Sequence, residues 1–435
     1  PLLFFIFRFA NLMNIQAIKR VLLLVGFIMT VSITLAQNRE VAQQTINTLC
    51  GEDFSGRGYI NKGDSVASAY IAKRMKDIGL QGYSSDFLNP FVLNVNTFNT
   101  TQVKVDQKDL RPGFDFLVAP EAKSAKGNYK VFYVSPKLLS SPKAVKKVKS
   151  AIKKGFVPVL CSYEATNKVL AENAAKIKKS LSGATFIQLK SSLTWSVAKN
   201  QSKNTEIELL DSVFDRYASE INITIEANFI KNYASQNVIG YVPGAEKPDS
   251  FIILCAHYDH LGKMGEAIFY GANDNASGIA TMLDLATYFV DHPQRYSLVF
   301  IAFGAEEAGL IGSLNYVRQP TVPLVNTRFV FNMDLMGSGD KGATIVNGSI
   351  YKNEYEALTK INTENDYLPL IKSRGKAANS DHYYFTEAGV PSFFIYLMGD
   401  YTFYHSPNDS PKNLHLGEYY DRSFQLIRDF IIYLN

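Results

Sequence analysis

The feature that most constrains the fold is a series of short, continuously apolar segments that begins at Asn237 and alternates with helix-like segments. The apolar segments are NVIGYVPG, SFIILCA, SLVFIAFG, RFVFNMDLMG and VPSFFIYLMG. Strands that are apolar on both faces must be covered on both faces. The sequence therefore predicts an α/β fold, with a mixed, mostly parallel, doubly wound sheet that carries helices on both faces.

The chain after the leader divides into three parts. Residues 37–99 are expected to form the N-terminal part of the same α/β domain, because they contain an apolar helical stripe that ends at Gly79. Residues 226–435 are its main part. Between them, residues 100–225 form a lysine-rich insert in which short strands and amphipathic helices are mixed, so we expect a smaller inserted α/β or β-rich domain.

The N-terminal segment has the layout of an export signal. Lys19 and Arg20 precede an apolar run that ends in small residues at Ala36. This run is shorter than the about 20 residues of a membrane span. We therefore expect residues 1–36 to be an upstream extension and a signal peptide, from about Met13 to Ala36. The mature protein would be periplasmic or secreted, with no stable membrane insertion after cleavage.

Charge and cysteine content exclude some classes of protein. Three cysteines allow at most one internal disulfide, so stability must come from a core. Residues 121–204 contain 17 lysines and three glutamates but no arginine or aspartate, a net charge of +14. The lysines fall in helix-like runs such as residues 141–155, where a solvated helical face explains them. With no arginine and few interleaved aromatic residues, we expect no nucleic-acid partner.

Histidines and carboxylates gather at the ends of the predicted strands. In open α/β sheets, ligands bind beyond the carboxyl ends of the strands. Five separate loops there each supply such a side chain. These residues are His257 and Asp259, Asp274, Glu306 and Glu307, Asp334, and His405.

This set of side chains is typical of a zinc centre. Imidazole and carboxylate groups bind Zn²⁺ and leave a position for water. An arrangement with two Zn²⁺ assigns His257 and Asp334 to one ion, Glu307 and His405 to the other, and Asp274 to both. Three carboxylates and one bridging hydroxide balance the charge of two zinc ions, and such ions lie about 3.5–4 Å apart.

Two further carboxylates are predicted to be catalytic. Alternate residues of a strand share a face, so Asp259 could accept a hydrogen bond from the ring nitrogen of His257 that does not bind metal, which would orient that ring. Glu306 and Glu307 are adjacent and should point in different directions. If Glu307 binds metal, Glu306 can act as the general base, taking a proton from metal-bound water and passing it to a leaving amine.

The segments HYDHLG, GANDNASG, AEEAG, NMDLMG and YHSPNDS resemble, in order and spacing, the co-catalytic zinc exopeptidases. That family includes secreted bacterial leucyl aminopeptidases and glutamate carboxypeptidase. The resemblance extends over residues 45–95 and 235–435. It implies metal ligands and catalytic residues at the same positions as above, and the insert occupies the place where many relatives carry a protease-associated domain.

The remaining histidines and tyrosines have simpler explanations. His260 is expected to be structural or to lie at the cleft rim, without binding metal. His382 is a rival to His405 as a ligand, but the family pattern favours His405. Tyr383 or Tyr384 could donate a hydrogen bond to a developing oxyanion, although a structural role is favoured among 25 tyrosines.

The sequence thus predicts an exported zinc exopeptidase, most simply an aminopeptidase that cleaves peptides by attack of metal-bound hydroxide. A carboxypeptidase or dipeptidase of the same family, a glutaminyl cyclase with one zinc ion, and an inactive binding module are the alternatives. Side-chain preference, amino- or carboxy-terminal specificity, the role of the basic insert, the oligomeric state and the native metal do not follow from the sequence.

Overall fold

The structure is a computed structural model that describes residues 39–163 and 167–435. Residues 40–435 form one compact unit. The predicted signal peptide, Met13 to Ala36, lies outside the described residues. Within the described ranges, no helix combines the length and the apolar character needed to cross a membrane.

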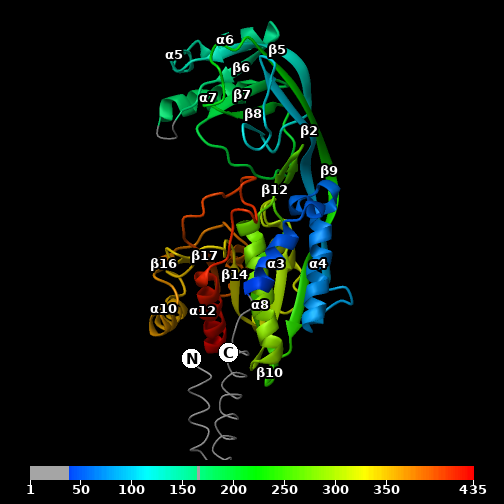
Figure 1. Ribbon diagram of the computed structural model, residues 1–435, viewed down its shortest axis with the longest axis vertical. Helices are drawn as coiled ribbons and strands as arrows, with labels where there is room; N and C mark the ends of the chain where they lie inside the picture. The colour runs from blue at the N-terminus through cyan, green and yellow to red at the C-terminus, as the bar shows by residue number, and fades with distance from the viewer. Residues whose placement is uncertain (1–38, 164–166) are drawn as a thin grey trace, which may run out of the picture. The chain divides into compact units, whose positions relative to one another are not determined.

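A mixed sheet forms the centre of the main domain (Figure 1). Its order is β1 (Gln81–Gly82), β9 (Glu220–Val242), β13 (Tyr296–Phe303), β10 (Lys247–His257), β14 (Thr327–Met333), β17 (Ser392–Leu397), β15 (Ala343–Val346) and β16 (Ile371–Arg374). The four middle strands, β13, β10, β14 and β17, are parallel. Strand β9 runs antiparallel to β1 and β13, and β15 runs antiparallel to β17 but parallel to β16. The predicted mixed, mostly parallel sheet is confirmed.

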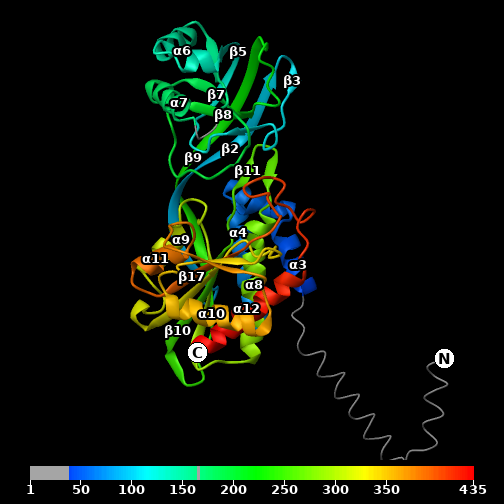
Figure 2. The same cartoon turned by 90° about the vertical axis from the view of Figure 1, so that its left-hand side faces the viewer.

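Helices cover both faces of this sheet, as predicted. Ile252 and Leu254 of β10 belong to the core under α3 (Arg39–Leu49), α4 (Gly63–Ile78), α8 (Ser277–Asp291) and α12 (Glu418–Leu434). Ile253 and Cys255 point to the opposite face and pack with α9 (Ile311–Arg318) and α11 (His382–Glu387). The continuous apolar run from Phe251 to Ala256 in β10 follows from this two-sided burial. Figure 2 shows α10 (Lys352–Asn365) beside α12.

The insert is a smaller α/β domain built on two long strands of the main domain. Strand β2 (Leu88–Val105) pairs antiparallel with β9, and β5 (Ala125–Val134) pairs with the other edge of β9. Strands β6 (Phe156–Leu160), β7 (Thr185–Lys190) and β8 (Thr205–Leu210) continue this sheet in parallel, and β4 (Phe116–Val118) ends it. Its helices are α5 (Pro136–Leu139), α6 (Ala144–Lys153) and α7 (Lys168–Ser180).

The insert and the main domain share strands and a core. Positions 99–100 and 225–226 lie inside β2 and β9, so both strands run continuously from one domain into the other. A hairpin of the main domain, β11 (Gly262–Met264) and β12 (Ala267–Phe269), buries Met264 and Phe269 in the core of the insert. The two domains are therefore packed together next to the loop that follows β10.

Candidate metal centre

The structure brings the five predicted ligands together at the carboxyl ends of the parallel strands. His257 ends β10, and Asp334 directly follows β14. Glu307 lies in the turn after β13, and His405 lies in the loop after β17. Asp274 lies in a short helical turn, η3 (Ala272–Ala276), just before α8. Parallel strands place their polar ends at one edge of the sheet, where these residues converge.

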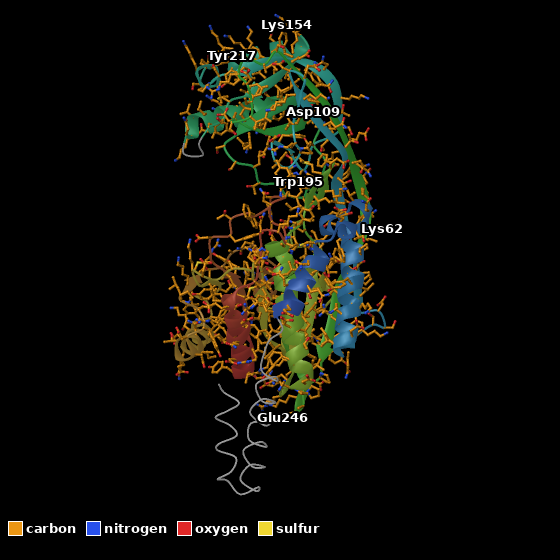
Figure 3. All side chains as sticks on the ribbon, viewed as in Figure 1. Lys62, Asp109, Lys154, Trp195, Tyr217 and Glu246 are labelled. Carbon is orange, nitrogen blue, oxygen red and sulfur yellow. The ribbon has the colours of Figure 1, made fainter. Side chains whose placement is uncertain are left out.

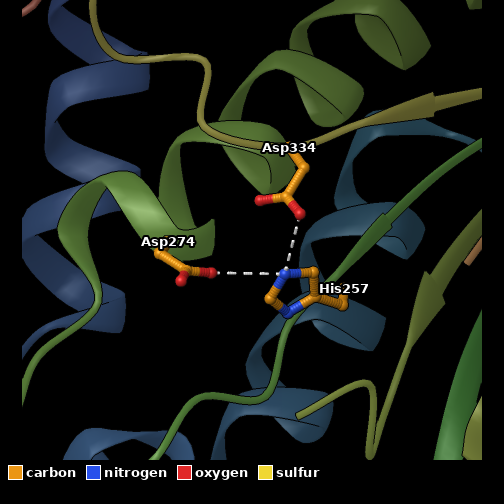
Figure 4. A group of neighbouring side chains, drawn as sticks. All are labelled: His257, Asp274 and Asp334. Carbon is orange, nitrogen blue, oxygen red and sulfur yellow. Dashed lines mark ion pairs between the residues drawn. The ribbon is translucent and has the colours of Figure 1, made fainter. Parts of the chain in front are cut away.

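His257 forms the first of two groups (Figure 4). Its Nε2 atom lies 3.3 Å from Oδ1 of Asp274 and 3.4 Å from Oδ2 of Asp334. The three side chains are buried, and their ligand atoms lie within 4.8 Å of one another. This group offers one imidazole nitrogen and two carboxylate oxygens to a cation.

His405 forms the second group, which shares Asp274 with the first. The Nε2 atom of His405 lies 3.2 Å from Oδ2 of Asp274 and 3.2 Å from Oε2 of Glu307. The Asp274 carboxylate thus directs one oxygen to each imidazole. Such a shared carboxylate is the geometry expected of a residue that bridges two metal ions.

The polar atoms of this cluster fit a cation rather than one another. Oδ2 of Asp274, Oδ1 of Asp334 and Nε2 of His405 are buried and have no hydrogen-bond partner in the described part of the chain. Buried polar atoms are normally paired, and unpaired ones indicate an ion or water. Three carboxylates and two imidazoles are also the donors that Zn²⁺ prefers.

The pKa values in the cluster show how strongly it attracts positive charge. Burial lowers the pKa of His405, but the carboxylates of Glu307 and Asp274 outweigh burial and raise that pKa to about 11. Burial raises the pKa of Asp274, but the rings of His257 and His405 reverse this effect and hold the pKa well below its usual range. The cluster therefore favours positive charge at the place that metal ions would take.

Asp259 does not orient His257 in the predicted way. Its backbone oxygen, not its carboxylate, is the partner of His257, at 3.1 Å from Nδ1; Oδ1 lies 3.9 Å away. The carboxylate instead accepts the backbone N–H groups of Glu306 (3.0 Å) and Glu307 (3.2 Å). The expectation assumed a strand through Asp259, but β10 ends at His257 and the chain turns there. Asp259 thus fixes the turn that carries both glutamates.

The two adjacent glutamates do point in different directions. One carboxylate oxygen of Glu307 contacts His405, and the other contacts His260. Among the described residues, Glu306 forms an ion pair with neither of these histidines. Burial, aided by the charge of Glu307 and opposed by His257, raises the pKa of Glu306 well above its usual value. A buried carboxyl group with a raised pKa suits proton transfer.

His260 is buried rather than placed at a cleft rim. Its side chain has no exposed surface, and its Nδ1 atom lies 2.9 Å from Oε1 of Glu307. The contact between His260 and Glu307 could not be predicted from the sequence. It depends on the direction that the chain takes after β10 ends at His257. His382, the rival to His405, lies on α11 against Phe394, at 5.4 Å between ring centroids.

Two supporting residues were missed in the sequence. Arg57 is completely buried and donates hydrogen bonds to backbone oxygens that include those of Tyr258, Gly271 and Asp274. Asp409 accepts the backbone N–H of Asp274 at 3.0 Å. The segments FSGRGY and YHSPNDS contain both residues, but bonds to backbone atoms leave no sequence signature. Together they fix the turn that carries Asp274.

A cavity of about 310 Å³ is lined by residues that are next in sequence to three of the predicted ligands: Asn273, Leu335 and Tyr404. It begins at Leu335, next to Asp334, and extends to Tyr404, next to His405. Its lining is largely aromatic and aliphatic: Asn273, Leu335, Ser338, Tyr396, Leu397, Met398, Gly399, Tyr401, Tyr404 and Asp409. Such a lining suits an apolar group next to the cluster.

Comparison with known proteins finds similarity over the part of the chain that contains this site. Residues 237–431 match the model of Peptidase family M28. Aminopeptidase YwaD of Bacillus subtilis (strain 168) is 31% identical over 205 residues, which cover 44% of this chain and 43% of YwaD. A probable zinc metalloprotease of Pyrenophora teres f. teres is 30% identical over 161 residues, or 33% of this chain and 32% of that protein. The matches thus span less than half of these relatives.

Solved structures share the fold over most of the chain. BSAP, a zinc aminopeptidase from Bacillus subtilis, superposes with a TM-score of 0.68 at 21% identity and covers 91% of this chain and 95% of its own. A Peptidase M28 precursor from Shewanella amazonensis SB2B superposes with a TM-score of 0.62 at 14% identity, covering 91% and 96%. The coverage shows that both folds include a counterpart of much of the insert.

Proposed function

Residues 237–431 match Peptidase family M28, and from this match we propose that the chain is a member of that family and an exported zinc aminopeptidase that removes N-terminal residues from peptides. The observation that carries the proposal is the Asp274 carboxylate, with one oxygen at 3.3 Å from His257 and the other at 3.2 Å from His405. The names of YwaD and BSAP, both aminopeptidases, support the amino-terminal choice.

Two zinc ions would be held by His257 and Asp334 on one side and by Glu307 and His405 on the other, with Asp274 between them. When bound, zinc polarises a carbonyl group and lowers the pKa of water. Glu306 takes a proton from the attacking water and delivers it to the amine that leaves. Asp259 holds Glu306 in place through the backbone N–H bond of 3.0 Å.

The cavity beside the site supports a preference for apolar first residues. Leu335, Tyr401 and Tyr404 line it, and Asp409 accepts hydrogen bonds from Tyr401 and from the backbone of Asp274. The Asp409 charge is therefore already paired within the protein. We assign this cavity to the side chain of the residue that is released.

Metal content and peptide cleavage test the proposal together. Elemental analysis of the purified protein should give two zinc ions per chain. Peptides with a free amino terminus should lose their first residue, whereas peptides acetylated there should stay intact and peptides amidated at the other end should still be cleaved. One zinc ion with pyroglutamate formation from N-terminal glutamine, or cleavage from the carboxyl end, would refute it.

Export is proposed on the leader-like sequence from Met13 to Ala36. The test is the mass and N-terminal sequence of the protein recovered from a bacterial expression host, compared between the cell interior and the exported fraction. A mature chain that begins at Gln37 in the exported fraction is expected. An intact N-terminus confined to the cell interior would contradict export.

A further inference from the structure

A loop of the insert is bonded directly to the predicted ligand His405. The Nδ1 atom of His405 lies 2.7 Å from the backbone oxygen of Trp195, and the backbone N–H of Trp195 donates to the backbone oxygen of His405 at 3.3 Å. A carbonyl oxygen can only accept, so Nδ1 carries the proton in this pair. The other nitrogen, Nε2, is then left facing Asp274 and Glu307, which is the tautomer that a metal ligand needs.

The Trp195 side chain anchors this loop in the shared core. Its indole N–H donates to the backbone oxygen of Val118 at 2.8 Å, and its ring stacks on Phe269 at 4.7 Å between centroids. The residue is 5% exposed. Val118 belongs to β4 of the insert, whereas Phe269 belongs to β12 of the main domain. Trp195 is thus fixed at the junction of the two domains (Figure 3).

His257, the other predicted histidine ligand, is oriented by its own chain segment rather than by a distant one. Nδ1 of His257 contacts the backbone oxygen of Asp259, two residues further along the same chain segment. The partner of His405 comes from 210 residues away, across the domain junction. We propose that Trp195 of the insert is a positioning residue for the metal centre, which holds His405 in its metal-binding tautomer and orientation. This inference rests on the proposed zinc function and gives the insert a role in it.

Zinc binding by three variants tests the inference. Trp195→Ala removes both the ring stack and the bond to Val118, Trp195→Phe keeps a ring but loses that bond, and Tyr217→Ala changes a residue of the insert that is 94% exposed. Zinc stoichiometry and affinity are measured in zinc-buffered solutions by competition with a chelator. Loss of such a supporting contact typically weakens metal binding about 10–100-fold.

We expect Trp195→Ala to keep one zinc ion at wild-type affinity and to bind the second about 10–100-fold more weakly. Trp195→Phe should show a smaller loss, and Tyr217→Ala should match the wild type. Wild-type affinity for both ions in Trp195→Ala, or an equal loss of both in a variant that still unfolds cooperatively, would overturn the inference.

A measurement on the unmodified chain covers the case in which Trp195→Ala does not fold. Zinc added to the metal-free protein should slow amide hydrogen exchange in residues 192–197 and leave α6 of the insert unchanged. Equal exchange of residues 192–197 with and without zinc would refute the coupling. If the wild type binds no zinc, the proposed function itself fails. If it binds two ions and cleaves peptides while the variants behave like the wild type, only the role of Trp195 fails.

Discussion

The Nδ1 atom of His260 lies 2.9 Å from Oε1 of Glu307, and the two side chains are 0% and 5% exposed. The other oxygen of Glu307 faces His405. His260 therefore holds one carboxylate oxygen while the other remains directed at the predicted zinc site. Partners of this kind fix the orientation of a metal-binding carboxylate.

Replacing His260 should weaken zinc binding without abolishing catalysis. We expect His260→Ala to lose about 10–100-fold in zinc affinity or activity, and His260→Gln to recover part of the loss because its amide can donate to Glu307. Competition with a chelator and peptide turnover at saturating zinc measure the two effects. The exposed His292 supplies the control, since His292→Ala should leave both values unchanged. Wild-type zinc affinity in His260→Ala would contradict this role.

Replacing the two adjacent glutamates should separate chemistry from metal binding. Glu306→Gln should reduce turnover by about 100–10,000-fold, the usual contribution of a general base, and retain both zinc ions. Glu307→Gln should instead lose zinc, because its carboxylate lies 3.2 Å from Nε2 of His405. Elemental analysis and turnover of a free-amino peptide distinguish them. Loss of zinc in Glu306→Gln alone would show that the two roles are exchanged.

Arg57 should be important for stability. Its guanidinium group is buried and bonds to backbone oxygens of Leu49, Tyr258 and Gly271 among others. Arg57→Ala leaves these oxygens buried without a donor, so we expect a loss of about 3 kcal/mol or more in the free energy of unfolding. Urea unfolding measures it. Arg216→Ala, at a side chain that is 62% exposed, should change stability by less than about 0.5 kcal/mol.

Arg57→Lys provides the stricter comparison. A lysine ammonium group keeps the charge but cannot reach several carbonyl oxygens with a planar fork of donors. We therefore expect Arg57→Lys to be almost as unstable as Arg57→Ala. Stability close to the wild type in Arg57→Lys would show that charge, rather than the number of hydrogen bonds, is what this site requires.

His382 should make stability depend on pH in the acid range. Burial lowers its pKa from 6.5 to about 4 in the folded chain. Between these values the unfolded chain binds a proton that the folded chain does not, so stability is fully present above pH 6.5 and falls towards pH 4. The pKa difference corresponds to about 3 kcal/mol.

The test compares urea unfolding of the metal-free wild type and His382→Gln at several pH values. Carboxylates of the metal centre titrate in both proteins, so the difference between their stabilities isolates His382. When the pH falls from 7 to 4, the free energy of unfolding of the wild type should decrease by about 2–3 kcal/mol more than that of His382→Gln. A constant difference would mean that His382 does not stay neutral in the folded chain.

The positions of His257 and Asp334 could be predicted because each residue lies at the end of one strand, and each strand is recognisable from its own local sequence. His257 ends β10 and Asp334 follows β14. The apolar runs Phe251–Ala256 and Phe329–Phe331 mark these strands, so the strands and the polar residues beyond them are visible in the sequence.

The prediction that the Asp259 carboxylate accepts a hydrogen bond from His257 was wrong. It required β10 to continue through Asp259, but β10 ends at His257, and the end of a strand depends on the strands that pair with it. The buried contact of His260 with Glu307 arises from the same turn.

The sequence by itself determined the covered, mostly parallel sheet and the set of five converging side chains, since both follow from local apolar patterns and from the polarity of parallel strands. The tertiary structure alone decided which groups hold those side chains. Trp195 meets His405 through backbone atoms across 210 residues, and Arg57 likewise bonds to backbone oxygens. Every residue carries the same backbone groups, so only the folded chain shows which of them meet.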